Sequence, residues 1–412
     1  MENNYKITVV EDVAGINSVQ GFKVGAAACD IRNKNDFQRL DTAVIVSDTL
    51  ATGAGVFTTN DVKAAPVLVD MANLERSKKV RAIVANSGNA NACTGDRGMK
   101  DAKDTCAFLA EKLGVEAGQV LVCSTGRIGE FMPMEKLQKG ITNALATSGT
   151  SDECARNAAS AIMTSDTRPK TVSVEVEFAG KKIKLAGMAK GAGMIEPNMA
   201  TMLAFIVSDA KISQSLLKEC LKFAANKSFN RITVDGDMST NDTVLCLCNG
   251  ASGVEVSEDD ADSIMAFRKG LLEASRVLAR KIVGDGEKIT KVVEVNVLGA
   301  KTEEQAEKIC RAIGNSLLVK SSWYGQDPNW GRITDAAGYA RTGIVLEKID
   351  LDYDGIPVLK AGQPIAENKP RWVEAVSKKT FTINLNLNLG SASESILAAD
   401  LTDGYVNFNK GE

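Results

Sequence analysis

The sequence contains no histidine among its 412 residues, and this absence limits the chemistry that the protein can use. Histidine is the usual general base that activates a serine, cysteine or threonine nucleophile near neutral pH. A nucleophile in this chain therefore needs another base. An α-amino group freed by chain cleavage is one of the few candidates, because its pKa lies near about 8.

Other features are missing as well. No apolar run approaches the roughly 18 residues of a membrane helix, so we expect no membrane partner. The formal net charge is −3, and we expect no nucleic-acid partner either. The first residues lack the basic and apolar regions of a signal peptide. We therefore expect a cytoplasmic protein.

The nine cysteines are scattered along the chain and include no C-x-x-C pair. Without histidine the common mixed zinc sites cannot form, and we expect no metal. Cys246 and Cys248 lie two residues apart in an apolar run, so they would share one face of a strand. We expect all nine to be reduced thiols, most of them buried.

Strands and helices are both predicted throughout the chain, which indicates an α/β (α+β) fold of two or three domains. Apolar residues alternate over 172–178, and the turn at Ala179-Gly180 predicts a hairpin that leads to Lys190. The apolar run 202–207 is typical of a strand buried on both faces. The alternation over 381–389 predicts a half-buried strand.

Three helices are predicted from their caps and apolar stripes. One spans 101–113, and one follows Ser213, a good N-cap residue. The third follows Thr302, which forms a capping-box pattern with Gln305. The apolar stripe of this third helix contains Ala306, Ile309, Cys310, Ile313 and Leu317.

The stretch from Lys190 to Met202 is rich in glycine and runs into the strand predicted over 202–207. If the bond between Ala200 and Thr201 is cut, Thr201 carries a hydroxyl and a free α-amine together. The amine can then take the hydroxyl proton, as in N-terminal nucleophile enzymes. Taken alone, however, these residue types favour a structural loop that enters a buried strand.

A second segment, Cys123 to Gly129, follows the apolar residues 120–122. Glycine and hydroxyl residues at a strand end can point backbone N–H groups at one spot, as an oxyanion hole requires. An ordinary strand-to-helix turn is the alternative. The polar segments 86–95, 235–243 and 327–332 are likewise typical of loops built from Asx turns.

Together these segments closely resemble the ornithine acetyltransferase family, also called glutamate N-acetyltransferase or the arginine-biosynthesis bifunctional protein. The resemblance runs nearly end to end and keeps the order of the family's motifs. The matching segments are 55–60, 86–95, 124–126, 163–167, 190–202, 235–243, 327–333 and 400–402.

The resemblance implies self-cleavage between Ala200 and Thr201, which gives an α chain of residues 1–200 and a β chain of residues 201–412. It implies a ping-pong reaction in which Thr201 takes acetyl from N-acetylornithine and passes it to glutamate. The family fold is α/β with layered sheets and helices, similar to N-terminal nucleophile enzymes. The usual assembly has two α and two β chains.

The resemblance also implies the roles of individual residues. Thr125 and Gly126 would line the oxyanion hole. The residues on substrate-contacting positions are Thr164, Lys190, Thr201, Glu287 and Asn409. Lys190 can pair with a substrate carboxylate, and Glu287 can pair with an ammonium group. No cofactor is expected, and the residues leave open whether acetyl-CoA serves as a second donor.

The chain departs from the family pattern at Asp61, Arg127 and Arg168, and no terminal hydroxyl residue follows Asn409. These departures motivate a second hypothesis, a related acyltransferase or amidohydrolase with the same threonine nucleophile and a different substrate. A third hypothesis is an uncleaved, inactive relative that only binds a partner.

Overall fold

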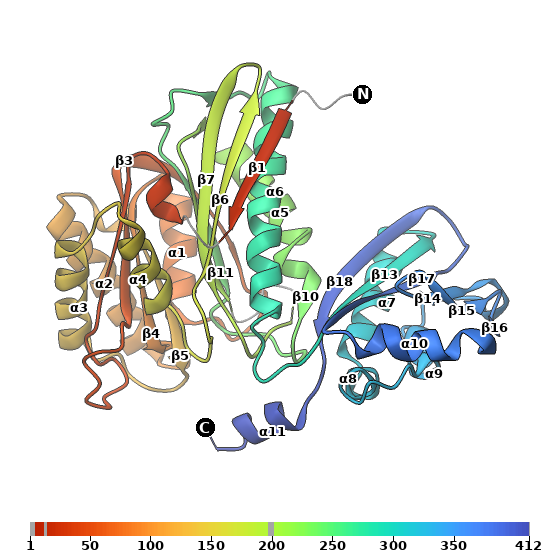
Figure 1. Ribbon diagram of the computed structural model, residues 1–412. Helices are drawn as coiled ribbons and strands as arrows, with labels where there is room; N and C mark the ends of the chain where they lie inside the picture. The colour runs from red at the N-terminus through yellow and green to blue at the C-terminus, as the bar shows by residue number, and fades with distance from the viewer. Residues whose placement is uncertain (1–4, 12–14, 197–201, 412) are drawn as a thin grey trace. The chain divides into compact units, whose positions relative to one another are not determined.

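The computed structural model describes residues 5–11, 15–196 and 202–411. These residues form two compact units, which we treat separately (Figure 1). In the described part of the chain, unit 1 takes in residues up to 191, 202–230 and 238–282. Unit 2 takes in residues 192–196, 231–237 and 283–411. Both units therefore draw on both sides of the predicted cleavage site.

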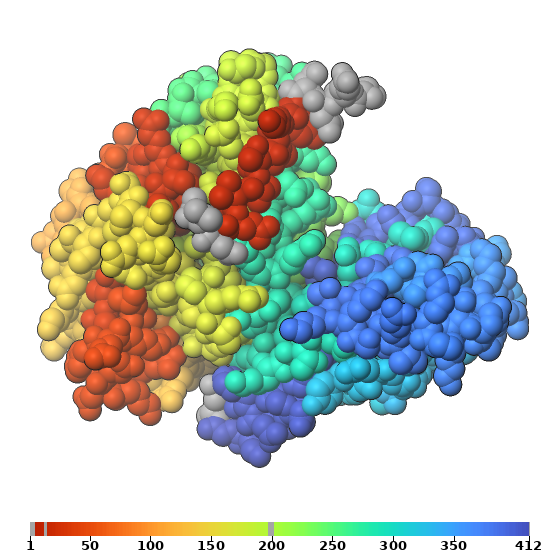
Figure 2. All heavy atoms as spheres, viewed as in Figure 1, coloured from red at the N-terminus to blue at the C-terminus, as the bar shows by residue number. Residues whose placement is uncertain are grey.

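Unit 1 is built around a nine-stranded sheet. Its strands are β1 (Tyr5–Glu11), β2 (Phe22–Ala27), β3 (Thr42–Phe57), β4 (Lys79–Asn89), β5 (Val120–Arg127), β6 (Lys170–Phe178), β7 (Lys181–Lys190), β8 (Leu203–Ser208) and β11 (Thr243–Cys248). The order is β1-β6-β7-β8-β11-β3-β4-β5, and β2 also pairs with β3. The edge strand β1 is largely exposed and forms part of the surface in Figure 2.

The long strand β3 belongs to two halves of this sheet. Its second half pairs with β11, whereas its first half pairs with β2 and β4. One buried cluster joins Val24 and Leu121 of the β2–β5 half to Phe205 and Leu245 of the other half. The two halves therefore face one another across a shared apolar core, as two packed layers.

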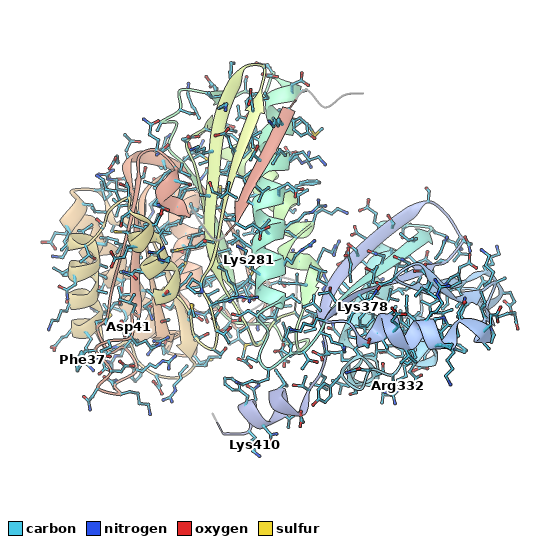
Figure 3. All side chains as sticks on the ribbon, in the orientation of Figure 1. Phe37, Asp41, Lys281, Arg332, Lys378 and Lys410 are labelled. Atoms are coloured by element: carbon cyan, nitrogen blue, oxygen red, sulfur yellow. The ribbon has the colours of Figure 1, made fainter. Side chains whose placement is uncertain are left out.

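Helices pack on these two layers. They are α1 (Ala65–Arg76), α2 (Gly95–Leu113), α3 (Met134–Ala146), α4 (Asp152–Ala161), α5 (Gln214–Asn226) and α6 (Ala261–Val283). Helix α4 contributes to the core that the layers share. Leu109 of α2 and Ile141 of α3 share a cluster with Val122 of β5. On the other layer, Lys281 of α6 donates a hydrogen bond to the Thr171 carbonyl of β6 (Figure 3). The layered α/β prediction is confirmed.

Several local predictions for unit 1 are confirmed too. Strands β6 and β7 form the predicted hairpin, and Ala179 and Gly180 at its turn have φ of 47° and 71°. Strand β8 is buried along its whole length. The Ser213 side chain caps α5 by accepting from the Leu216 N–H. The small strands β9 (Lys211–Ile212) and β12 (Glu255–Val256) form a separate pair.

Unit 2 is a seven-stranded sheet with helices packed on it. Its strands are β10 (Ile232–Thr233), β13 (Val292–Ala300), β14 (Asp350–Tyr353), β15 (Ile356–Lys360), β16 (Gln363–Pro364), β17 (Thr380–Asn386) and β18 (Ala392–Ala399). Its helices are α7 (Glu303–Asn315), α8 (Leu317–Tyr324), α9 (Trp330–Tyr339), α10 (Lys369–Ser377) and α11 (Asp403–Asn409). The first four of these helices share one buried cluster with the sheet.

Three predictions for unit 2 need correction. Gln305 does not complete a capping box, because its side chain accepts from the Lys301 N–H at 2.8 Å while Thr302 alone caps α7. Leu317 lies outside the apolar stripe, since α7 ends at Asn315 and Leu317 is an exposed residue of α8. Strand β17 ends at Asn386, because Asn388 adopts a φ of 51°.

All nine cysteines are free. Cys93 is exposed, Cys154 is half-buried and the others are buried, as predicted for most of them. No helix in the described part of the chain combines the length and the apolar character that crossing a membrane requires.

Candidate active site

The predicted oxyanion segment forms the end of strand β5, next to the end of β4. Thr125 is buried, and Gly126 has a φ of 133°. A Cβ on Gly126 would lie 2.3 Å from the carbonyl carbon of Gly88. Only glycine fits there, since no side chain could share that space or that backbone conformation. The backbone of Thr125 and Gly126 is therefore held tightly against β4.

Two asparagines hold this segment in place. Ser124 donates from its hydroxyl to Asn86 Oδ1 at 2.7 Å. The Asn241 amide group donates to the carbonyls of Ser124 at 2.9 Å and Ala90 at 2.6 Å. Asn241 thus connects the segment before β11 to the ends of β4 and β5. Asn86 belongs to strand β4 and not to a loop, and the sequence does not predict this cross-linking role.

The three departures from the family pattern in unit 1 lie at exposed positions. Arg127 has a side chain that is 57% exposed and pairs with Glu130 at 3.3 Å. Asp61 and Arg168 are exposed as well.

Lys190 ends strand β7 and is buried, with a fractional exposure of 2%. It interacts with the Asp166 carboxylate, which also accepts from the Gly191 N–H at 2.7 Å and from the Thr164 N–H at 3.0 Å. Lys170 donates to the same carboxylate at 2.6 Å. We call Lys170, Asp166 and Lys190 the buried lysine cluster. It ties together the predicted substrate residues Thr164 and Lys190.

The charges of this cluster are strongly coupled. Burial by itself would raise the pKa of Asp166, but the Lys190 and Lys170 ammonium groups and the Gly191 amide lower it to about 2. Asp166 is therefore ionised at neutral pH. The carboxylate stays charged because two cations share it.

Ala200 and Thr201 lie outside the described residues. The described chain resumes at Met202, whose N–H belongs to the peptide bond that follows Thr201. Asp242 accepts from this N–H at 2.9 Å. Asp242 is fully buried, and burial raises the pKa of its carboxyl well above the usual range. The start of β8 is thus fixed by a carboxyl group next to β11.

In unit 2, Glu287 and Asn409 are brought together although they are far apart in the sequence. The Asn409 side chain donates to Glu287 Oε2 at 3.0 Å. The Glu287 N–H donates to the Ala192 carbonyl at 3.0 Å. A Cβ on Gly193 would lie 2.4 Å from the Glu287 carboxylate, so this glycine lets the loop pass close to it.

The loop after Lys190 is anchored by Asp235, the first residue of the segment 235–243, to which the sequence assigns no individual role. Its carboxylate accepts from the N–H groups of Met194 at 2.6 Å and Ile195 at 2.7 Å. Tyr405 of α11 donates to the same carboxylate at 3.2 Å. The loop and the C-terminal helix therefore share one acidic anchor. Burial raises the pKa of Asp235 above its usual value.

The predicted site residues thus form three groups in the described structure. Thr125 and Gly126 end β5, Asp166 joins Thr164 to Lys190, and Glu287 contacts Asn409. Sequence reasoning missed the residues that support these groups, which are Asn86, Asp166, Lys170, Asp235, Asn241 and Asp242. Most of these residues lie in or beside the matching motifs, and this position is the signal that could have identified them.

The protein has an α/β fold. Among its candidate site residues, Lys190 belongs to a buried cationic cluster, and Glu287 supplies a carboxylate. The ArgJ family model matches residues 23–411. The arginine biosynthesis bifunctional protein ArgJ of Geobacter sulfurreducens is 44% identical over 393 residues, which are 95% of this chain and 98% of that protein. The chain belongs to the ArgJ family, which confirms the resemblance seen in the sequence.

Two solved structures are also similar. ArgJ from Bacillus halodurans is 36% identical, with a TM-score of 0.44 over 47% of this chain and 100% of that chain. Ornithine acetyltransferase from Mycobacterium tuberculosis, solved with ornithine, is 33% identical. Its TM-score is 0.42 over 47% of this chain and 98% of that chain.

Proposed function

We propose that this protein transfers an acetyl group from N-acetylornithine to glutamate through a covalent acetyl-Thr201 intermediate. Acetyl transfer in arginine biosynthesis follows from its membership of the ArgJ family. The observation that carries the finer proposal is the buried lysine cluster at the end of β7. A buried cationic group suits a ligand with a carboxylate, as amino acids have.

The first step of the proposal is self-cleavage. The Thr201 hydroxyl attacks the Ala200 carbonyl carbon, and the bond between that carbon and the Thr201 nitrogen breaks as the nitrogen takes up the hydroxyl proton. Water then hydrolyses the resulting ester, which leaves a carboxylate on Ala200 and restores the hydroxyl. The hydrogen bond from Met202 to Asp242 supports this step, because it fixes the peptide that follows the nucleophile.

Acetyl transfer then takes place in two half-reactions. The free α-amine of Thr201 accepts the hydroxyl proton as Thr201 Oγ attacks the acetyl carbonyl of N-acetylornithine. Ornithine leaves with that proton on its nitrogen. The glutamate amine attacks the acetyl ester in turn, and N-acetylglutamate leaves while the threonine hydroxyl is restored. Thr125 and Gly126 donate hydrogen bonds to the oxyanion in both half-reactions.

Lys190 binds the substrate carboxylate, and Thr164 contacts the substrate beside it. Glu287, oriented by Asn409, binds an ammonium group. No cofactor takes part in this reaction. Acetyl-CoA is a second acetyl donor, and its thiol is then the leaving group in place of the ornithine amine. We further propose an assembly of two α and two β chains in the cytoplasm.

The cleaved fragments are expected to stay together. Strand β8 follows the cleavage site, yet it pairs with β7 on one side and with β11 on the other. Cutting the chain before β8 leaves these ladders intact. Separation of the fragments therefore requires denaturation, and their number is best read from a denaturing gel.

The experiment that tests the proposal combines this gel with an acetyl-transfer assay. Purified protein should run as two fragments of nearly equal size and should form N-acetylglutamate from N-acetylornithine and glutamate. A parallel reaction with acetyl-CoA and glutamate tests the second donor. We expect Thr201→Ala to abolish both cleavage and turnover, and Thr201→Ser to keep part of each.

Two outcomes would overturn the proposal. A single full-length band that persists on incubation would exclude self-cleavage. Robust turnover by Thr201→Ala would show that another group is the nucleophile. Native mass measurement tests the assembly, and fractionation of cells tests the location.

A further inference from the structure

We propose that Asp166 and Lys170 are positioning residues of the subsite that binds the α-carboxylate of the substrate amino acid. This inference rests on the proposed function and extends it to two residues for which that function gives no role. It follows from how the buried lysine cluster is connected and from how its charges add up.

The cluster lies where two neighbouring strands meet. Lys170 is the first residue of β6 and Lys190 is the last residue of β7, and Lys170 is paired with Ala189 in the ladder between them. Lys170 is fully buried, with an exposure of 0%, and the Asp166 side chain is buried with it. An ion pair placed this deeply keeps one geometry, because separating its charges leaves each of them buried without its partner.

Asp166 uses both carboxylate oxygens to hold three chain segments. Oδ1 accepts from Lys170 Nζ at 2.6 Å and from the Gly191 N–H at 2.7 Å. Oδ2 accepts from the Thr164 N–H at 3.0 Å. The two predicted substrate residues, Thr164 and Lys190, are therefore attached to one carboxylate, through the Thr164 backbone and through the residue that follows Lys190.

Lys170 fixes the position of that carboxylate. Its ammonium group also lies 3.4 Å from the Arg168 carbonyl oxygen, so it spans the loop that carries Asp166. A lysine at the surface would contribute little to such an arrangement, since exposed ion pairs are weak. At a buried site, the same pair limits the movement of the carboxylate and of the two backbone amides attached to it.

The charge of the cluster matches the ligand. Two ammonium groups and one carboxylate give these three side chains a net charge of +1. A buried excess of positive charge is costly unless an anion offsets it. A substrate carboxylate bound at Lys190 brings a negative charge next to this positive one, so the cluster favours amino acids over amines of the same shape.

The test compares ornithine with putrescine, which is ornithine without its carboxylate. Binding of each compound to the cleaved protein is measured by titration calorimetry, together with the KM and kcat for N-acetylornithine. We expect wild-type protein to bind ornithine at least about tenfold more tightly than putrescine, which corresponds to about 1.4 kcal/mol.

Three variants complete the test. In Asp166→Asn and Lys170→Met, we expect the preference for ornithine to fall about tenfold and the KM for N-acetylornithine to rise by a similar factor. The kcat at saturation should change less than about threefold. Lys182→Met is the matched control, because Lys182 forms an exposed pair with Glu175 at 2.9 Å in the same hairpin. It should leave the preference unchanged.

The outcomes separate this inference from the proposed function. If wild-type protein turns over N-acetylornithine but the variants keep the full preference for ornithine, Asp166 and Lys170 have no role in the subsite. If the variants lose affinity for ornithine and for putrescine by the same factor, Asp166 and Lys170 have a purely structural role. If wild-type protein itself neither prefers ornithine nor forms N-acetylglutamate, the proposed function fails. Asp166→Asn keeps the side-chain shape, so a folding defect in Lys170→Met does not prevent the test.

Discussion

The two units arrange the charged residues of the candidate site in contrasting ways. In unit 1, Lys170, Asp166 and Lys190 are buried at the ends of paired strands. In unit 2, Glu287 is half-buried in a loop, and Asn409 is exposed on the short helix α11. The first group is cationic with a net charge of +1, whereas the second contributes a carboxylate.

This difference has an energetic consequence. Buried charges are costly when a partner is lost, because water cannot replace the partner. The loss of a partner costs an exposed charge less, since water solvates the charge that remains. Unit 1 should therefore respond sharply to small changes, and unit 2 should respond mildly.

The largest effect is expected at Gly126 in unit 1. In Gly126→Ala, the new Cβ meets the Gly88 carbonyl carbon at 2.3 Å, and alanine is strained at a φ of 133°. The ends of β4 and β5 must separate, which moves the N–H groups that we assign to the oxyanion. We expect kcat to fall by about 100-fold, as when one oxyanion donor is removed.

Gly129→Ala is the matched control for this prediction. Gly129 lies in the same segment and has a φ of 85°, but a Cβ there meets nothing within 4 Å. Both variants strain the backbone, and only Gly126→Ala pushes the strands apart. Similar kcat values in the two variants would show that contact with Gly88 is not what positions the site.

A smaller effect is expected at Glu287 in unit 2. Glu287→Gln keeps an oxygen that can accept from Asn409 but removes the charge that we assign to an ammonium partner. Because the carboxylate is half-buried, we expect the KM for N-acetylornithine or glutamate to rise about tenfold with little change in kcat. Steady-state kinetics with each substrate varied in turn measures this.

Asn409→Ala provides the comparison within unit 2. It leaves the charge of Glu287 and removes one exposed hydrogen bond at 3.0 Å, so KM should rise no more than about threefold. If Asn409→Ala is as damaging as Glu287→Gln, the orientation of the carboxylate matters more than its charge. The contrast between the units would then have to be revised.

The sequence predicts the local elements well, because their signals are local. The alternation over 172–178 defines β6 of the hairpin, and Ser213 marks the start of α5. Prediction from the sequence fails where tertiary contacts override a local pattern. Gln305 accepts from Lys301 and not from its capping partner, and Leu317 leaves the stripe because the helix ends before it.

The candidate site shows the same division. The motifs identify Gly126, Lys190 and Glu287, but not what holds them. Asp166 lies in the segment 163–167 without an assigned role, and Lys170 lies outside the motifs. Only the pairing of β6 with β7 brings them to Gly191. Glu287 and Asn409 lie 122 positions apart, and no local pattern connects them. Supporting residues of this kind depend on strand pairing and chain path.

Another buried lysine, Lys320 in α8 of unit 2, extends the comparison of the two units to stability. Its exposure is 2%, and its ammonium group donates to the Ala399 carbonyl. Lys170 of unit 1, in contrast, is bonded to a carboxylate at 2.6 Å. Burial lowers the pKa of Lys320 from 10.5 to about 8, although Asp235 and Asp400 oppose the shift.

This shift predicts a stability gain at alkaline pH. Below about pH 8 the folded and unfolded chains both carry the proton on Lys320, and the cost of burying the charge is fully present. Between about pH 8 and 10.5 only the unfolded chain keeps it, so folding becomes more favourable as pH rises. The gain is on the order of 3 kcal/mol at most.

Urea denaturation of wild-type protein and Lys320→Met at about pH 7.5 and about pH 9.5 measures this gain. Methionine fills a similar volume without a charge, so the wild type should gain stability relative to the variant as pH rises. Lys308→Met, at an exposed lysine of α7, should show no such change relative to the wild type. Activity should not change in either variant. Parallel pH dependence of the wild type and Lys320→Met would show that Lys320 keeps its ordinary pKa despite its burial.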